Sequence, residues 1–422
     1  MRPPHLPMRS EREKPIMKIV EINSCIFGST GKIMADIAAN EEKNGNSVTV
    51  CFPASRENAK RNYSGRKIII GDRVSRNLHL FLARMTGYGG CFSVIATKRF
   101  LHKLDAVHPD IIHLHNLHNC YINLPMLFRY IKKRGIPVVW TLHDCWAFTG
   151  QCPHFSMAAC GKWETGCGGC PQFREYPEAR VDRTKTMFRL KKKWFTGVKK
   201  LTVVTPSEWL AGLVRRSFLG CYPVRVIHNG IDLSVFRPTP SDFREKHGIT
   251  DEEKMILGVA FGWGKRKGLD VFISLASRLK REEYRIVLVG TDEMVEAELP
   301  EGIIPVRRTH SREELAAIYT AADVLVNPTR EDNYPTVNME AEACGTPVIT
   351  FRTGGSPESV FTDHGAVVEC DDIGGTEREI RRICSGGRGV KDAVAAQAEI
   401  FDAAKCFEGY TAIYREMSKN SE

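Results

Sequence analysis

The sequence of 422 residues lacks any continuously apolar run of the roughly 18 residues that a membrane-spanning helix needs. Its first stretch, MRPPHLPMRSEREKPI, has no apolar core, which excludes a secretory signal peptide. We expect residues 1–16 to form a disordered extension, or Met17 to be the true start of translation. Internal repeats and low-complexity tracts are also missing. These absences favour a globular protein of the cytoplasm.

The composition is that of ordinary folded domains with a basic surface. Hydrophobic residues make up 42% of the chain and charged residues 26%, which suits two or three domains with real cores. The formal net charge of +10 favours a polyanionic partner, either nucleotide phosphates, nucleic acid or an anionic membrane. A basic surface with no specific partner is the alternative. In the cytoplasm, the 14 cysteines are expected to be reduced thiols or metal ligands rather than disulfides.

Short apolar runs alternate with helical patterns along the whole chain. The runs show little polar alternation, so both faces of each sheet should be covered. Strands that alternate with helices predict parallel sheets, here in two doubly wound, Rossmann-like α/β domains. The predicted strands are 17–24, 47–52, 110–116, 138–144, 201–207 and 224–230 in the first domain, and 254–260, 284–290, 323–329 and 346–351 in the second.

A change in composition, with two prolines near residues 229–243, places the domain junction at about residues 218–240. We therefore predict an N-terminal domain over 17–218, with a cysteine-rich loop at 145–172, and a C-terminal domain over 219–395. Ligands of doubly wound sheets bind outside the carboxyl ends of the strands, so the cleft between the domains is the expected site.

The segment FGSTGKI (27–33) follows the first strand. It is not a nucleotide-binding P-loop, because Ile26 and Ile33 stand where that motif needs Gly and Ser or Thr. A glycine-rich turn before a helix still offers backbone N–H groups to an anion. Contacts to phosphate or sugar are therefore predicted for Gly28, Ser29, Thr30 and Gly31, with a plain strand-to-helix turn as the alternative.

Three histidines occur in HLHNLHN (113–119). His113 and His115 point to one side of a strand, and His118 lies in the following loop. A zinc triad is conceivable, but no carboxylate or cysteine stands nearby to complete it. We favour lining of a polar cleft, above all by Asn116 and His118.

The segment TLHD (141–144) ends another apolar strand. His143 would lie at the mouth of the cleft, where a histidine can hydrogen-bond a hydroxyl or transfer a proton. Asp144 could orient it. The alternative is that both residues merely cap the next segment.

Four cysteines follow, with the spacing Cys152-x7-Cys160-x6-Cys167-x2-Cys170. Four thiolates ending in C-x2-C within a glycine-rich loop predict a structural zinc site, and disulfides or free thiols are the alternatives. A redox C-x-x-C would normally open a helix, which the glycines between these cysteines disfavour. Cys145 is expected to pack behind the strand.

Residues 183–201 form a basic amphipathic helix candidate, in which Met187, Leu190, Trp194 and Val198 share one face. Such a helix can lie on an anionic membrane. The narrow apolar stripe favours the other interpretation, in which it packs on the protein's own core.

Phosphate-binding signals dominate the second domain. Lys265, Arg266 and Lys267 precede a helix start, where they can clamp a diphosphate together with the helix N-terminus, unless they form a solvated charge run. The segment FRTGGSPESV (351–360) also places glycines, including Gly355, between a strand and a helix start.

The most informative stretch is TREDNYPTVNMEAEACGTPVI (329–349). Pro335 suits the first turn of a helix, so Asp332 lies in the loop ahead of it and Glu340 inside it. The backbone N–H groups of Thr336 and Val337 would then point at an anion.

This stretch resembles the signature of retaining GT-B glycosyltransferases of family 4, in which two acidic residues precede a Cys-Gly-Thr-Pro-Val run. RKGLDVF resembles the family's donor-phosphate motif and VIHNGIDLSVFRP its interdomain junction. FDAAKCFEGYTAIYREM resembles its last helix, which implies that residues 396–422 cross back to the first domain. The resemblance runs from Met17 to nearly the end. The region TLHDCWAFTG to CPQ resembles a bacterial branch that builds colanic acid and other polysaccharides.

The resemblance implies roles for individual residues. Glu340 would hold the donor ribose, Asp332 or else Glu331 would contact the transferred sugar, and His143 would face that sugar near the reacting centre. Donor contacts are implied for Gly28, Gly31, Arg266, Lys267, Thr336, Val337 and Gly355. The family often has Arg five residues before the motif Lys, whereas this chain has Gly262.

The implied activity is retaining, metal-independent transfer of a hexosyl group from a nucleotide-diphosphate sugar to a saccharide acceptor in exopolysaccharide or lipopolysaccharide synthesis. The acceptor would be lipid-linked, and the enzyme would sit in the cytoplasm or on the inner face of its membrane through residues 183–201. The alternatives are a sugar-nucleotide epimerase or a phosphorylase of the same fold, and a zinc-stapled nucleic-acid-binding protein. The last ranks low, because few aromatic residues interleave with the basic patch.

Overall fold

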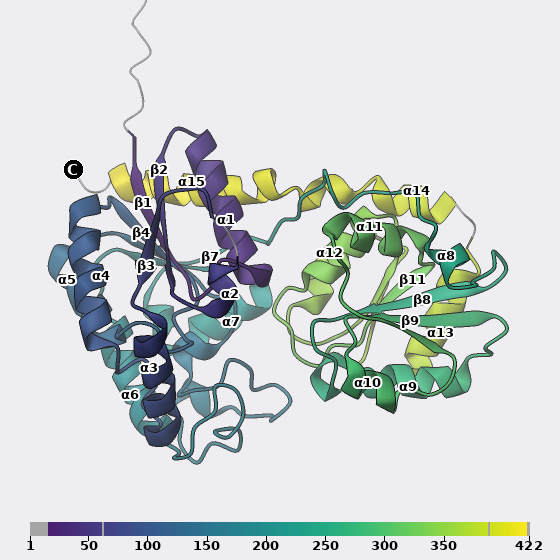
Figure 1. The fold of residues 1–422 in the computed structure, drawn as a ribbon, viewed down its shortest axis with the longest axis horizontal. Helices are drawn as coiled ribbons and strands as arrows, with labels where there is room; N and C mark the ends of the chain where they lie inside the picture. The colour runs from purple at the N-terminus through teal and green to yellow at the C-terminus, as the bar shows by residue number, and fades with distance from the viewer. Residues whose placement is uncertain (1–15, 61–62, 387–388, 420–422) are drawn as a thin grey trace, which may run out of the picture.

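The computed structural model describes residues 16–60, 63–386 and 389–419. It contains two parallel sheets with helices on both faces, side by side in Figure 1, which confirms the predicted doubly wound α/β fold class. The extension predicted for residues 1–16 lies outside the described residues except for Ile16.

The first sheet has seven strands in the order β3-β2-β1-β4-β5-β6-β7. The strands are β1 (Lys18–Ile22), β2 (Ser47–Pro53), β3 (Lys67–Ile70), β4 (Ile111–Leu114), β5 (Val138–Thr141), β6 (Leu201–Thr205) and β7 (Val224–Val226). The helices are α1 (Gly28–Lys43), α2 (Arg56–Ala59), α3 (Arg73–Thr86), α4 (Val94–Val107), α5 (Leu124–Arg134), α6 (Thr184–Phe195) and α7 (Glu208–Arg216). Because β7 pairs with β6, this sheet continues to Val226, past the predicted boundary at residue 218.

The second sheet has six strands in the order β10-β9-β8-β11-β12-β13. The strands are β8 (Lys254–Val259), β9 (Tyr284–Val289), β10 (Ile303–Val306), β11 (Val324–Asn327), β12 (Val348–Phe351) and β13 (Ala366–Val368). The helices are α8 (Phe243–Lys246), α9 (Leu269–Arg278), α10 (Glu293–Glu298), α11 (Arg312–Ala321), α12 (Thr336–Ala343), α13 (Ile373–Cys384), α14 (Gly389–Ala395) and α15 (Ala403–Lys419).

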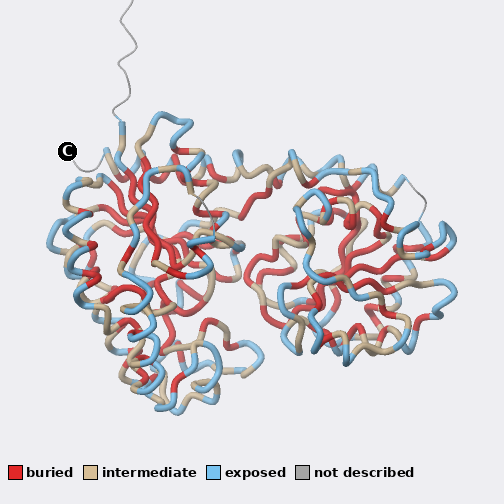
Figure 2. Tube along the Cα trace, viewed as in Figure 1, coloured by how far each residue is buried: buried red, intermediate tan, exposed pale blue. Residues whose placement is uncertain are grey.

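The central strands are buried because helices cover both faces of each sheet, as the buried segments in Figure 2 show. In β4, β5, β11 and β12 every residue is buried, which explains their mostly apolar sequence. Capping residues mark where the intervening helices begin and end. For example, the Asn123 side chain accepts from Met126 N–H at the start of α5, and Gly135 ends that helix with φ of 67°.

The strand order reverses between β1 and β4 in the first sheet and between β8 and β11 in the second. At such a switch point the connections leave in opposite directions, which opens a crevice at the carboxyl ends of the two strands. The loops that follow these strands hold most of the side chains that the sequence singles out.

The last helix joins the two halves. α15 leaves the second domain and runs along the first, as Figure 1 shows. Its residues Phe407, Tyr410 and Tyr414 are buried in the core between β1 and α1. Thr411 hydrogen-bonds Glu41 of α1.

The helix at 184–195, α6, does not present its apolar stripe to solvent. Met187, Phe188 and Phe195 are buried, and Val198 beyond the helix is buried too. Lys191 is also buried and donates to the carbonyl oxygen of Trp146 at 2.6 Å. Leu190 and Trp194 of the predicted stripe are half-buried. The stripe therefore packs mostly on the protein core, as its narrowness favours, and membrane contact through residues 183–201 stays a prediction. Among the described helices, none combines the length and the apolarity that crossing a membrane requires.

Candidate active site

A cation and a carboxylate meet at the switch point of the second sheet. Lys267 ends a short 3-10 turn (Lys265–Lys267) after β8, and Asp332 lies between β11 and α12. Lys267 Nζ lies 2.5 Å from Oδ2 of Asp332, and both side chains are mostly buried. Burial raises the pKa of Asp332, but Lys267 outweighs it and the pKa falls below its ordinary value. Two residues predicted to contact the donor are thus adjacent.

The neighbouring acid has a different partner. Oε1 of Glu331 accepts a hydrogen bond from Met157 N–H, in the cysteine-rich loop of the first domain, at 2.7 Å. Arg266 Nη1 donates to the carbonyl oxygen of Glu331 at 3.1 Å. Glu331 therefore ties the two domains together, while Asp332 is the acid that faces the cationic turn. Gly262, at the place of the family's arginine, has φ of 80°, a conformation that favours glycine.

The N-terminus of α12 opens beside this pair. Pro335 is the N-cap and contributes no side-chain hydrogen bond, so the first N–H groups, those of Thr336 and Val337, have no partner within the helix. Glu340 lies one turn further on, where its Oε2 accepts from the Tyr319 hydroxyl at 2.9 Å. Burial raises the pKa of Glu340. The open N–H groups can bind an anion, and the carboxyl group of Glu340 can accept from a hydroxyl group of the same ligand.

Gly355 lies under the same loop for a steric reason. A Cβ atom there would stand 1.9 Å from the carbonyl oxygen of Asn333 and 2.7 Å from Cβ of Ser207, so only glycine fits. Asn333 bridges the domains, because its Oδ1 accepts from Ser207 Oγ at 2.6 Å and its Nδ2 donates to the carbonyl oxygen of His143 at 3.2 Å. Glu358 accepts from the first N–H groups of α7, so it caps that helix.

The glycine-rich turn of the first domain begins α1. The N-cap Phe27 gives no side-chain hydrogen bond, which leaves the N-terminal N–H groups of α1 open. Gly28 has φ of 69°, and a Cβ atom on Gly31 would lie 2.6 Å from the backbone of Ile26. The side chain of Asn23 donates to the carbonyl oxygen of Thr30 at 3.2 Å and holds the turn.

His143 belongs to a chain of hydrogen bonds that crosses three strands. Its Nε2 lies 3.1 Å from Nδ1 of His115, which follows β4, and the two rings are stacked. Nε2 of His115 lies 2.7 Å from Oε2 of Glu21 in β1. The sequence analysis overlooked Glu21, whose side chain is fully buried.

These contacts determine which nitrogen of His143 carries the proton. Burial raises the pKa of Glu21, but His113 and His115 outweigh it and lower the value to about 2, so the carboxylate only accepts. Nε2 of His115 must therefore donate. Burial lowers the pKa of His115 to about 4, so the ring is neutral near pH 7 and its Nδ1 accepts from His143. Burial also lowers the pKa of His143, which leaves its Nδ1 as a hydrogen-bond acceptor.

The prediction that Asp144 orients His143 is wrong. Oδ2 of Asp144 instead lies 3.0 Å from Nε2 of His118, and its Oδ1 accepts from Trp146 N–H at 2.8 Å. Burial raises the pKa of Asp144, but His118, His154 and the hydrogen bond from Trp146 N–H together outweigh it and lower the value to about 2. The other ring nitrogen of His118 lies 3.1 Å from the Tyr176 hydroxyl. His118 and Asn116 both line a small cavity with His143, which matches the predicted polar lining.

The buried histidines do not lack a carboxylate, because Glu21 reaches both His113 and His115 from the neighbouring strand. Within the described residues, this is the only group of three or more His, Cys, Asp or Glu side chains whose ligand atoms lie within 4.8 Å of one another. Both nitrogens of His113 already have protein partners, Thr141 Oγ1 at 2.8 Å and the Tyr414 hydroxyl at 2.6 Å. The cluster is therefore a hydrogen-bond network under His143.

Several site residues carried no recognisable signal in the sequence. His154, in the cysteine-rich loop, interacts electrostatically with Asp144 of its own domain and with Glu331 of the other, while burial lowers its pKa. Arg330 anchors the loop of Asp332 through ion pairs with Asp270 at 2.8 Å and Asp371 at 2.6 Å. Each depends on partners far away in the sequence.

The four cysteines predicted to bind zinc line one small cavity with Phe155 and Trp163. All fourteen cysteines of the chain are free thiols, which excludes the disulfide alternative here. Cys167 Sγ accepts from Gly150 N–H at 3.1 Å. Four cysteine sulfur atoms are suitable zinc ligands. These four do not all lie within 4.8 Å of one another, whereas the ligand atoms of Glu21, His113 and His115 do. Cys145 is buried against the same core, as predicted.

The two doubly wound sheets, each with its own switch point, define a two-domain fold of the GT-B class. Sucrose-phosphate synthase of Thermosynechococcus elongatus has a similar structure, with a TM-score of 0.69 at 18% identity over 95% of this chain and 99% of that one. HepE of Anabaena, solved in complex with UDP and glucose, gives a TM-score of 0.66 at 14% identity over 95% of this chain and 100% of that one. At these identities the likeness concerns the fold.

Sequence comparison supplies the family. The family model described as Glycosyltransferase Family 4 matches residues 31–235, and the model described as Glycosyl transferases group 1 matches residues 253–385. The chain belongs to the family 4 type of glycosyltransferases. WcaC of Escherichia coli, named as a colanic acid biosynthesis glycosyl transferase, is 26% identical over 276 residues, which are 63% of this chain and 65% of that protein. The chain thus spans just under two thirds of that relative's length.

Proposed function

We propose that this glycosyltransferase moves a hexosyl group from a nucleotide-diphosphate sugar to a lipid-linked saccharide during synthesis of a cell-surface polysaccharide. The observation that carries the proposal is the Lys267–Asp332 pair beside the open N-terminus of α12, next to Asn333, which donates to the carbonyl oxygen of His143. A leaving diphosphate needs cations and N–H donors at this position, whereas the transferred sugar needs polar groups for its hydroxyls.

The proposed donor pose assigns one role to each group of the cleft. Arg266, Lys267 and the N–H groups of Thr336 and Val337 surround the phosphates, and Glu340 accepts from the ribose hydroxyls behind them. The sugar then lies between Asp332 and His143, whose Nδ1 accepts from one sugar hydroxyl. When the diphosphate departs, Lys267, which Asp332 holds in place, offsets its growing charge.

We infer that the anomeric configuration is retained and that a metal ion is not required. The carboxylates nearest the reacting position have N–H partners, Asp332 with Lys267, Glu331 with Met157 and Asp144 with His118. This supports attack by the acceptor from the face that the diphosphate leaves, without a covalent enzyme intermediate. The cationic groups of the cleft supply the charge that a metal would otherwise contribute.

A donor screen tests this function directly. Thermal shift against UDP-, GDP- and ADP-sugars should identify one nucleotide class that stabilises the protein, by binding only the folded state. Transfer from that donor should proceed in EDTA, and NMR of the product should show the anomeric configuration of the donor. An absolute need for added Mg²⁺ or Mn²⁺ would contradict metal independence, and an inverted product would contradict retention.

A further inference from the structure

Exposed apolar side chains gather on one helix of the first domain. In α3, Val74, Leu78, Phe81 and Met85 follow one another at spacings of four, three and four residues, so they form a stripe along one face. Their exposed fractions are 77%, 56%, 58% and 38%. Of the fourteen residues of this helix, only His79 and Ala83 are buried. The stripe is thus unlike that of α6, which packs on the core.

Two more apolar side chains are exposed at the start of α4, which is held beside α3. Val94 and Ile95 are exposed by 53% and 69%. Nδ1 of the buried His79 lies 2.8 Å from Oγ of Ser93, and Nε2 of His79 accepts from Phe92 N–H. These contacts hold the first turn of α4 against the middle of α3. We call the six apolar residues of this surface, Val74, Leu78, Phe81, Met85, Val94 and Ile95, the α3–α4 patch.

Basic residues outnumber acidic ones along α3 and α4, although Arg84 pairs with Glu178 on the cavity side. Residues 72–103 contain six Lys or Arg and one acid, Asp72. Asp72 is used locally, because its side chain accepts from Ser75 N–H at 2.7 Å as the N-cap of α3. Arg73, Lys98 and Arg99 are exposed. An apolar stripe with a cationic border complements a bilayer that contains anionic lipids.

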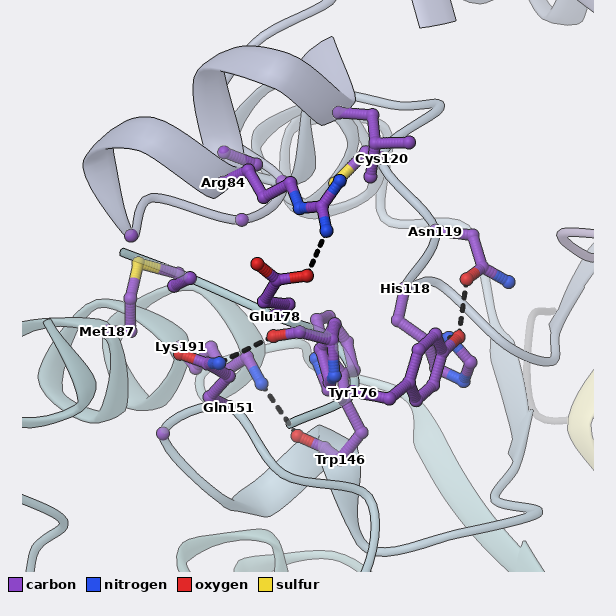
Figure 3. A pocket seen from close by; sticks show the side chains of 18 of the residues that line it. Arg84, His118, Asn119, Cys120, Trp146, Gln151, Tyr176, Glu178, Met187 and Lys191 are labelled. Atoms are coloured by element: carbon purple, nitrogen blue, oxygen red, sulfur yellow. Dashed lines mark hydrogen bonds and ion pairs between the residues drawn. The ribbon is translucent and has the colours of Figure 1, made fainter. Parts of the chain in front are cut away.

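The opposite face of α3 lines a cavity of about 450 Å³ in the first domain. Arg76, Leu80, Ala83 and Arg84 of α3 contribute to it. Figure 3 shows Arg84 paired with Glu178 on one side, and His118, Asn119 and Tyr176 on the other. His118 hydrogen-bonds Asp144, the residue after His143, so the cavity leads toward the reacting position. A single helix therefore separates the exposed apolar patch from a cavity that reaches His118 beside the active site.

We propose that the α3–α4 patch docks on the surface of an anionic bilayer, with α3 lying in the interface. The purpose of this contact rests on the proposed function. A lipid-linked acceptor could keep its lipid in the bilayer while its saccharide enters the cavity along α3. The docking itself depends only on the apolar stripe and its basic border.

Vesicle flotation tests the proposal with the full-length protein. The parent protein should float with vesicles of phosphatidylglycerol and phosphatidylcholine, and weakly or not at all with phosphatidylcholine alone. The double variant Leu78→Asp/Phe81→Asp should lose at least tenfold in partitioning. Met294→Asp is the matched control, because Met294 is 77% exposed on α10 of the other domain and should partition like the parent. Arg73→Glu/Arg99→Glu should weaken binding at low salt.

Other outcomes would overturn the docking surface. These are parent protein that does not bind anionic vesicles, or a Leu78→Asp/Phe81→Asp variant that binds as well as the parent. A dimer in sedimentation velocity that this variant dissolves, without vesicle binding, would instead assign the patch to a second copy of the chain. Calorimetry with the donor identified by thermal shift tests the proposed function separately, because both variants keep the donor site intact.

Discussion

The Nδ1 atom of His115 lies 3.1 Å from Nε2 of His143, and this contact passes the influence of Glu21 from β1 to the cleft. Because the carboxylate can only accept, each ring in the chain has one possible tautomer at neutral pH. His143 therefore meets a bound sugar as an acceptor. The crossing helix α15 supports the network from below, since its Tyr414 hydroxyl lies 2.6 Å from Nδ1 of His113.

Removing Glu21 should disturb His143 without touching the substrate. We expect Glu21→Leu to lower kcat/KM by about 10–100-fold, in the range seen when a supporting group behind a functional histidine is lost. Nitrogen-15 NMR of the imidazoles is the decisive measurement. The parent should show His143 protonated on Nε2, whereas the variant should show a mixture of tautomers. Glu21→Gln keeps an acceptor and should restore most of the activity. A parent His143 protonated on Nδ1 would refute the network.

Glu340→Ala should weaken donor binding by about 10–100-fold, because one or two hydrogen bonds to a charged group are lost. Isothermal calorimetry with the preferred nucleotide sugar measures this change. Tyr319→Phe is the control, since it removes only the hydroxyl that Glu340 now accepts from. An unchanged affinity of Glu340→Ala for the nucleotide sugar would contradict the proposed contact between Glu340 and the ribose.

Lys267→Ala should reduce kcat by about 100-fold, as expected for loss of one group that stabilises developing charge. It should also leave the buried Asp332 without its cationic partner. Lys265→Ala removes the same charge two residues away from an exposed position and should change kcat little. Steady-state kinetics of both variants show whether kcat depends on a direct contact of Lys267 with the diphosphate or on the total positive charge of the turn. Equal losses in the two would contradict the assignment of Lys267.

Elemental analysis of protein purified under reducing conditions should find about one zinc per chain if the four cysteines of the loop act together. Cys167→Ser should lower that content, whereas Cys221→Ser, at an exposed position in the same domain, should leave it unchanged. Metal-free protein with full activity and unchanged stability would eliminate the zinc prediction.

Acid should destabilise the protein through its buried histidines. Burial lowers the pKa of His79 and of His115 from 6.5 to about 4. Above pH 6.5 both are neutral whether the chain is folded or unfolded, and stability is complete. As the pH falls from 6.5 toward 4, only the unfolded chain takes up these protons, so the free energy of unfolding drops by up to about 1.4 kcal/mol per pH unit for each histidine.

Urea denaturation at pH 7, 6 and 5 measures that slope. His79→Gln should reduce it by the share of one histidine, although it also weakens the contact to Ser93 at every pH. The same slope in the parent and in His79→Gln would show that His79 does not titrate in this range.

Local sequence was sufficient for the architecture and for the donor half of the site. The adjacent strands β8 and β11 are mostly apolar runs, and Lys267 follows the carboxyl end of the first while Asp332 and Glu340 follow that of the second. A parallel sheet brings such ends together whatever the loops do. Strands β3, β10 and β13 were missed because each lies at the edge of its sheet and is only partly buried, so its sequence lacks a long apolar run.

By itself, the sequence determined the doubly wound fold, the family and the cationic donor turn, because these depend on patterns within a few tens of residues. Only the tertiary structure decided that His118 and not His143 is the partner of Asp144, that Glu21 stands behind His115, and that α3 rather than α6 leaves its apolar face exposed. Each of these depends on which side chains from different strands or helices lie side by side. A single sequence does not record how close residues far apart in the chain come in space.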